Sequence, residues 1–184
     1  MTRISELASQ LLTENAKTIG QHFALMPLRI ILELRSILLE IGQHALLVEK
    51  LLEGLKHSEA RVRYNCALAM DHIADERCSE PLRALFEDTV PKVRRAALHS
   101  LSCETCKVTP LPMPGDLIET LSATAMSDLN IRVRRTAVDS LAETCTDPRV
   151  IPALQALEAT NTDAGMQQRL KRALKTVSLN SLQN

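Results

Sequence analysis

Apolar residues recur at helical spacing along almost the whole chain. Intervals of three and four residues place such side chains on one face of an α-helix. A denser apolar run from Leu28 to Ile41 predicts a more fully buried helix. Gly20, Pro27 and Gly42 fall between these segments, so helix ends are expected near them. Two of the stripes are Ile4, Leu7, Ala8, Leu11 and Leu12, and Leu46, Leu47, Leu51, Leu52 and Leu55.

Beyond residue 60 the chain repeats itself. VRYNCALAMDHIAD (62–75), VRRAALHSLSCET (93–105) and VRRTAVDSLAETC (133–145) align with one another, and LKRALKTVSL (170–179) is a weaker fourth copy. In the first three copies a small residue stands four places after the first valine, and a bulky apolar residue stands eight places after it. Each copy therefore predicts one amphipathic helix. The anchor positions are Val62, Val93, Val133 and Leu170, at spacings of 31, 40 and 37 residues.

A second helix is expected before each copy. Its best start signals are SEPL (79–82) and DPRV (147–150), in which a side-chain oxygen can accept from the first free amides and proline is tolerated. Two helices per 30 to 40 residues indicate an all-α fold, an α-solenoid of about four to five antiparallel helix pairs. We expect a single domain over 1–177, with N-terminal capping helices at 1–42 and repeats at 43–177. A proline-rich loop spans 106–115, and 178–184 is expected to be a flexible tail.

Composition narrows the class of protein. The three aromatic residues, Phe23, Tyr64 and Phe86, are too few for base-stacking nucleic-acid modules or for most β-folds. Lys+Arg and Asp+Glu both number 22, which excludes a diffuse polycation but not a local basic patch. Five cysteines, an odd number, favour reduced thiols and a cytoplasmic location. Neither a signal peptide nor a membrane-spanning segment is expected.

Three segments carry a resemblance to a known family. DPRVIPALQAL, EDTVPKVRRAALHSL and SDLNIRVRRTAVDSLAE resemble HEAT repeats of the bacterial phycobilisome-lyase type. The resemblance implies an α-solenoid that serves as a binding scaffold. It does not imply one reaction, because such proteins include scaffolds, lyase subunits and relatives in DNA repair. It also implies that Asp88, Asp128 and the arginine one place after each anchor bridge adjacent repeats.

Basic residues are concentrated at the start of each repeated helix. Eleven of the twelve positions one before, one after and two after the anchors are basic, although cations are unfavourable at helix N-termini. The positions one before and two after share a helix face, and we expect them to align on the concave surface with the position six after. A solvated face balanced by acids such as Glu59 is the alternative. The candidate binding residues are Arg61, Tyr64, Lys92, Arg95, His99, Arg132, Arg135, Asp139, Arg169 and Arg172.

A second constellation combines thiols and imidazole. Cys103 and Cys106 form one CxxC, and a zinc site there would add His72 and either Asp71 or Cys78. The alternative is that the cysteines are compact core residues, as expected for Cys66 and Cys145. HExxH, GxSxG and the P-loop are absent from the sequence, so no catalytic residue and no cofactor are expected.

These features favour a non-catalytic scaffold. Its concave basic surface is expected to bind an acidic protein segment or another polyanion. Binding to the phosphate backbone of nucleic acid is an alternative. A lyase or metal-binding protein that uses Cys103, Cys106 and His72 is another.

Overall fold

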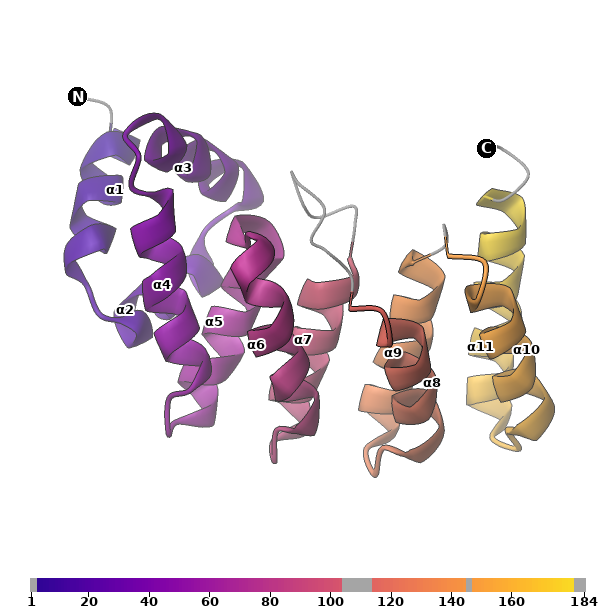
Figure 1. The fold of residues 1–184 in the computed structure, drawn as a ribbon. Coiled ribbons are helices and arrows are strands. Elements are labelled where there is room, and N and C mark those ends of the chain that lie inside the picture. Colours follow the sequence, from indigo (N-terminus) through magenta and orange to yellow (C-terminus); the bar gives the residue numbers. More distant parts are fainter. Residues whose placement is uncertain (1–2, 104–113, 145–146, 181–184) are drawn as a thin grey trace.

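The structure is a computed structural model that describes residues 3–103, 114–144 and 147–180. These residues form eleven α-helices and two short 3-10 helices (Figure 1). Within the described residues, no helix combines the length and the apolar character that a bilayer span requires. The all-α solenoid expected from the sequence is confirmed.

Three helices precede the repeats: α1 (Arg3–Thr13), α2 (Ala16–Leu25) and α3 (Leu28–Glu40). They cover the first end of the solenoid (Figure 1), with α2 packed against α4 and α5 and α1 packed against α3. The Asn15 side chain begins α2 by accepting a hydrogen bond from the Thr18 N–H at 3.0 Å.

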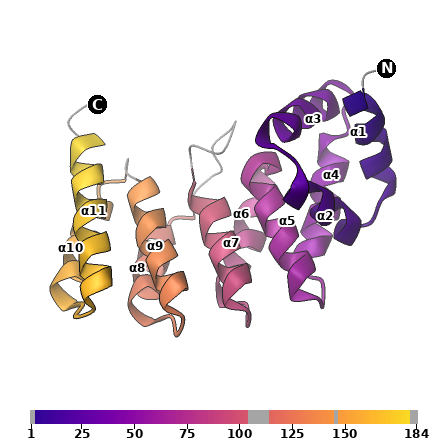
Figure 2. The same ribbon diagram turned by 180° about the vertical axis from the view of Figure 1, so that it is seen from behind.

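Four antiparallel pairs follow and form two layers. The first helices of the pairs face the viewer in Figure 1, and the second helices face the viewer in Figure 2. Each second helix packs against the next one, and α2 extends this layer beyond α5. The pairs are α4 (His44–Leu55) with α5 (Ala60–Ile73), α6 (Ser79–Ala84) with α7 (Pro91–Ser102), α8 (Leu117–Ser127) with α9 (Ile131–Glu143), and α10 (Val150–Thr160) with α11 (Ala164–Asn180). The 3-10 helices Glu76–Cys78 and Leu85–Glu87 flank α6.

The Leu28–Ile41 run does form a helix, but the prediction that this helix is more fully buried is wrong. Only three residues of α3, Ile31, Leu34 and Leu38, are buried. Leu28 and Leu39 are 49% exposed and Ile41 is 50% exposed. The reason is the place of α3 at the end of the molecule, where only one of its faces has a neighbour to pack against.

The fourth repeat has a different register from the one that the sequence suggested. In the first three repeats the residue that precedes the second helix, Glu59, Val90 or Asn130, lies three places before the anchor. In α11 this place is taken by Asp163. Its carboxylate accepts from the Met166 N–H at 2.7 Å and its carbonyl accepts from the Gln167 N–H at 2.8 Å. The anchor is therefore Met166, four residues before Leu170.

Side-chain hydrogen bonds confirm this register. Arg63, Arg94 and Arg134, one place after their anchors, each donate to the carbonyl oxygen six residues earlier. Gln167 donates to the Asn161 carbonyl in the same way, at 2.6 Å. Met166 and Leu170 are both buried and stand one helical turn apart, so apolar spacing alone could not choose between them.

Several predicted boundaries shift by a few residues. Helix α6 begins at Ser79, so Cys78 occupies the capping position. The Cys78 side chain makes no capping hydrogen bond. Asp147 does accept from the Arg149 N–H, at 2.8 Å, just before α10. Helix α11 continues to Asn180, past the boundary expected at residue 177. Of the loop expected at 106–115, residues 106–113 lie outside the described part of the chain.

Candidate functional site

The arginines one place after the anchors join neighbouring repeats. The Arg63 guanidinium forms two hydrogen bonds with the Asp88 carboxylate, at 2.6 and 3.0 Å, and Arg94 forms two with Asp128, both at 2.7 Å. The four side chains are 5 to 15% exposed. The bridging role implied by the family resemblance is thus confirmed for these two pairs, and Arg63 and Arg94 are not available to a partner.

Both aspartates are held as carboxylates. Burial alone would raise the pKa of Asp88 and Asp128, but hydrogen bonds outweigh it and both pKa values lie below the usual range of aspartate. The donors are the bridging arginine and a backbone N–H, that of Val90 for Asp88 and of Asn130 for Asp128. Each aspartate therefore stabilises the start of the second helix that follows it and links that helix to the preceding repeat.

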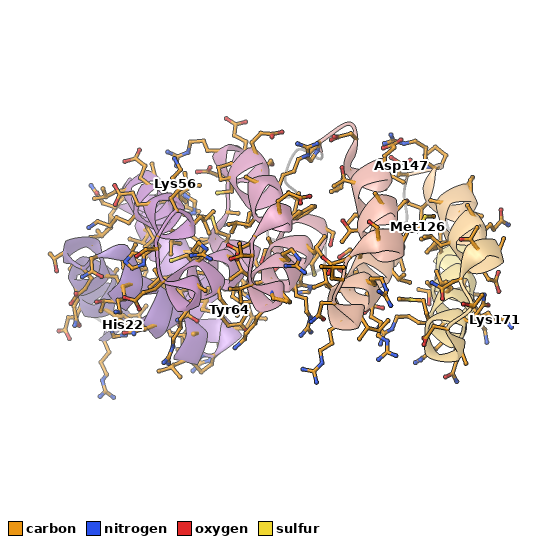
Figure 3. The ribbon with its side chains drawn as sticks, turned by 90° about the horizontal axis from the view of Figure 1, so that it is seen from below. His22, Lys56, Tyr64, Met126, Asp147 and Lys171 are labelled. Carbon is orange, nitrogen blue, oxygen red and sulfur yellow. The ribbon has the colours of Figure 1, made fainter. Side chains whose placement is uncertain are left out.

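The residues before and two after the anchors lie on the outer side of the second-helix layer. Tyr64, Lys92 and Arg95 line a pocket of about 310 Å³ between α5, α7 and α9, together with His99 and Asp139. Figure 3, a view from below, shows Tyr64 on the opposite side of the molecule from Lys56. The structure thus brings these five predicted residues together around one pocket.

Contacts between repeats hold these side chains in a row. The Lys92 Nζ lies 4.0 Å from the centre of the Tyr64 ring, a cation–π contact across α5 and α7. The Arg95 Nε donates to the Thr136 Oγ1 at 3.1 Å, across α7 and α9. The Arg135 guanidinium lies beside Gly165, where a β-carbon would stand 3.0 Å from its Nη2. Neighbouring repeats thus meet along this row through contacts that leave the positive charges unneutralised.

The remaining predicted members are less uniform. Arg61 and Arg132 are exposed near the starts of α5 and α9 and line neither pocket described here. Arg169 and Arg172 line a second pocket of about 300 Å³ between α9 and α11. Because of the register change, they stand three and six places after the fourth anchor. Arg169 donates to the Asp139 carboxylate at 2.6 Å, so its charge is neutralised.

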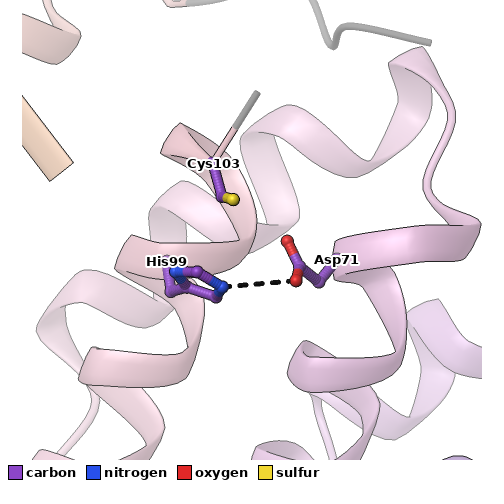
Figure 4. Close-up of side chains that lie close together, drawn as sticks. All are labelled: Asp71, His99 and Cys103. Atoms are coloured by element: carbon purple, nitrogen blue, oxygen red, sulfur yellow. Dashed lines mark ion pairs between the residues drawn. The ribbon is translucent and has the colours of Figure 1, made fainter. Parts of the chain in front are cut away.

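A cluster of different chemistry lies along the same layer, nearer the ends of α5 and α7. Figure 4 shows Asp71, His99 and Cys103 with their side chains directed toward one another. The His99 Nε2 is 3.3 Å from the Asp71 Oδ2, and one ligand atom from each of the three residues lies within 4.8 Å of the others. The hydrogen bond with Asp71 raises the pKa of His99 against the opposing effect of burial.

This cluster differs from the set that the sequence suggested. His99, predicted only as part of the binding surface, takes the central place, and His72 borders the cluster with its Nε2 3.7 Å from the Asp71 Oδ2. Cys78 lies elsewhere, with its Sγ 4.0 Å from the Asp75 Oδ1. Cys106 and Cys145 lie outside the described residues. The overlooked signal was the spacing of His99 and Cys103, four residues apart and hence on one helix face.

Comparison with known proteins supports the repeat assignment. Residues 48–110 match the family model for HEAT repeats. This match does not distinguish the phycobilisome-lyase type. The crystal structure of an engineered protein from the Northeast Structural Genomics Consortium is similar over 96% of this chain and 80% of its own, with a TM-score of 0.55 and 18% sequence identity. A search among curated proteins found no match to this sequence.

Proposed function

We propose that this HEAT-repeat protein is a non-catalytic scaffold whose second-helix layer binds an acidic segment of a partner protein. The binding surface, here called the basic stripe, consists of Arg61, Lys92, Arg95, Arg132, Arg135 and Arg172. HEAT repeats generally serve as protein-interaction scaffolds, and the basic stripe adds a preference for negative charge.

The observation that carries this proposal is the contrast between neighbouring arginines. Arg63 and Arg94 are each used by an aspartate of the next repeat. Among the described residues, no carboxylate lies within 4.0 Å of a cationic group of the basic stripe. All of these cations except Arg172 lie in the first five residues of their helices. Cations near helix N-termini oppose the helix dipole, so the fold alone gives little reason to place them there. A partner carboxylate would relieve this unfavourable arrangement.

The geometry indicates the shape of the partner. Packed helices lie about 8–10 Å apart, so the basic stripe presents positive charge at about that interval from α5 to α11. An extended chain covers about 3.3 Å per residue. A segment with an acidic residue at roughly every third position would therefore match the stripe, because three extended residues span the distance between neighbouring helices.

The test measures binding of a fluorescent acidic peptide with glutamate at every third position, by anisotropy at low ionic strength. We expect the Arg95→Glu/Arg135→Glu variant to bind at least about tenfold more weakly, because two attractive contacts become repulsive. The matched control is Lys56→Glu/Arg29→Glu, which reverses two exposed charges outside the stripe and should leave affinity within about twofold.

Equal binding by the Arg95/Arg135 variant and the wild type, with unchanged helicity, would contradict the proposal. Duplex DNA serves as the second probe. Tighter binding of DNA than of the peptide at the same salt concentration would assign the basic stripe to nucleic acid instead, since phosphate contacts alone give strongly salt-dependent affinity.

A further inference from the structure

The Asp71, His99 and Cys103 cluster brings together three side chains that ligate transition metals. Asp71 comes from α5, whereas His99 and Cys103 come from the last turns of α7 and from the residue that follows it. Asp71 is 5% exposed and Cys103 is 2% exposed, so two of the three groups are buried. The basic stripe does not use any of them.

The spacing suits a small tetrahedral ion. Bond lengths of about 2.0–2.3 Å to nitrogen, oxygen and sulfur place the ligand atoms of a tetrahedral zinc site roughly 3.3–3.8 Å apart. The His99 Nε2 and the Asp71 Oδ2 are already 3.3 Å apart, and one ligand atom from each of the three residues lies within 4.8 Å of the other two. The ligand atoms therefore need to approach one another by at most about 1 Å to reach the separations of a tetrahedral site.

The donor set selects the type of ion. Thiolate and imidazole favour zinc and related borderline metals, whereas Mg²⁺ and Ca²⁺ require oxygen ligands. We propose that the Asp71 Oδ2, the His99 Nε2 and the Cys103 Sγ bind Zn²⁺, with a fourth position open to water. On binding, the Cys103 thiol loses its proton to solvent as the sulfur–zinc bond forms, and His99 binds as neutral imidazole.

A fourth side chain is placed to orient His99. The Glu143 Oε2, from α9, lies 3.9 Å from the His99 Nδ1, the ring nitrogen on the side away from Asp71. A carboxylate on the second ring nitrogen of a metal-binding histidine fixes the ring and its tautomer and leaves the first nitrogen free to ligate. At 3.9 Å the two atoms are beyond hydrogen-bond distance, and an approach of roughly 0.7 Å would give Glu143 this positioning role. The site then draws on three consecutive repeats.

The cluster is also accessible. His99 lines the pocket of about 310 Å³ on the second-helix layer and a neighbouring pocket bounded by Phe23, Met26 and His72. Its side chain is 39% exposed. The His99 imidazole is therefore open to solvent, and the buried Asp71 and Cys103 close the inner side of the site.

The experiment titrates metal-free, reduced protein with Co²⁺ and then with Zn²⁺. We expect one equivalent of Co²⁺ to give a thiolate-to-cobalt charge-transfer band, and one equivalent of Zn²⁺ to abolish it. Cys103→Ser should lose the band, and Asp71→Asn and His99→Ala should weaken Co²⁺ binding at least about tenfold. Glu143→Gln should weaken it by roughly tenfold while the band persists.

The matched control is Cys78→Ser, which removes another buried thiol that lies outside the cluster, and it should keep the band. A second measurement requires no variant: one equivalent of Zn²⁺ should slow alkylation of Cys103 at least about tenfold, as mapped by mass spectrometry. Absence of stoichiometric binding by the wild type would overturn the proposal, as would a band that survives in Cys103→Ser. The expected result with Cys103→Ser would assign the sulfur ligand.

Discussion

At the scale of single residues, the adjacent arginines Arg94 and Arg95 have different roles. Arg94 is 12% exposed and forms two hydrogen bonds with Asp128 across a repeat boundary. Arg95 is exposed and donates to Thr136. One residue of offset rotates a helical side chain by about 100°, which turns it from the inter-repeat seam to the outer surface. Substitutions at the two positions should therefore affect different properties.

Asp128→Asn is expected to lower the free energy of unfolding by about 3 kcal/mol at pH 7, because it leaves the mostly buried Arg94 guanidinium without its counter-ion. The measurement is urea unfolding followed by circular dichroism. Glu119→Gln is the control: its carboxylate meets Arg149 at 3.1 Å with both side chains about half exposed, so the loss should stay below about 1 kcal/mol. Equal losses in the two variants would contradict this assignment.

The same carboxylates set the response to acid. Because the pKa values of Asp88 and Asp128 are lower in the folded chain than in the unfolded one, their contribution is complete from about one pH unit above the unfolded value of about 3.9. It is lost as the pH falls through the folded values. The free energy of unfolding should thus begin to fall near pH 5 and continue to fall below pH 4, and this fall should be smaller in Asp128→Asn than in the wild type.

At the scale of elements, close packing around Cys66 joins three helices. Cys66 on α5 is fully buried, and Gly20 on α2 and Gly54 on α4 both face it. A β-carbon at Gly54 would collide with the Cys66 sulfur and stand 3.1 Å from the Ala16 β-carbon. The close approach of Cys66 and Ala16 therefore requires glycine at position 54, inside α4. The expectation that Cys66 fills a small-residue position in the core is confirmed, and burial raises the pKa of its thiol to about 12.

Gly54→Ala is therefore expected to destabilise the protein by about 1–3 kcal/mol through overpacking, although alanine is the better helix former by about 1 kcal/mol. Combining it with Cys66→Ala should remove much of this penalty, because the clashing sulfur is gone. Gly115→Ala, where a β-carbon would meet nothing within 4 Å, is the control and should be nearly neutral. Thermal melts of the four variants give the coupling, and additive effects of Gly54→Ala and Cys66→Ala would contradict it.

At the scale of the whole molecule, the first three helices cover one end of the stack of repeats. Helix α2 packs on α4 and α5, and α3 leaves half-exposed leucines on its outer side. In a solenoid each unit buries its apolar surface against its neighbours, so a terminal unit is needed to cover the end of the stack. Here that unit also supplies Gly20 against Cys66, which ties it to the first repeat.

Deleting residues 1–42 should therefore expose the buried apolar side chains of α4 and α5 and lower the melting temperature by several degrees or cause aggregation. Size-exclusion chromatography and thermal melts would measure this. Leu25→Ser is the control, because Leu25 is 86% exposed on α2 and its loss should change neither property. A truncated chain as stable and monodisperse as the intact protein would show that the repeats do not need the cap.

Apolar spacing and recurring residues were enough to predict the helices, their pairing and the first three repeats. Apolar spacing and small residues at fixed places are local signals, since a helix buries one face wherever it packs. The family resemblance also predicted that Arg63 and Arg94 bridge adjacent repeats. The exposed face of α3 did not, because apolar spacing does not reveal that a helix lies at the end of the stack.

The register of the fourth repeat and the surroundings of His99 could be seen only in the folded chain. Met166 and Leu170 are equivalent by periodicity, and hydrogen bonds of Asp163 and Gln167 select Met166. His99 and Asp71 are far apart in the chain and meet because α5 and α7 pack side by side. Contacts between repeats depend on how far each unit is rotated on the one before it, and no single repeat carries that information in its own sequence.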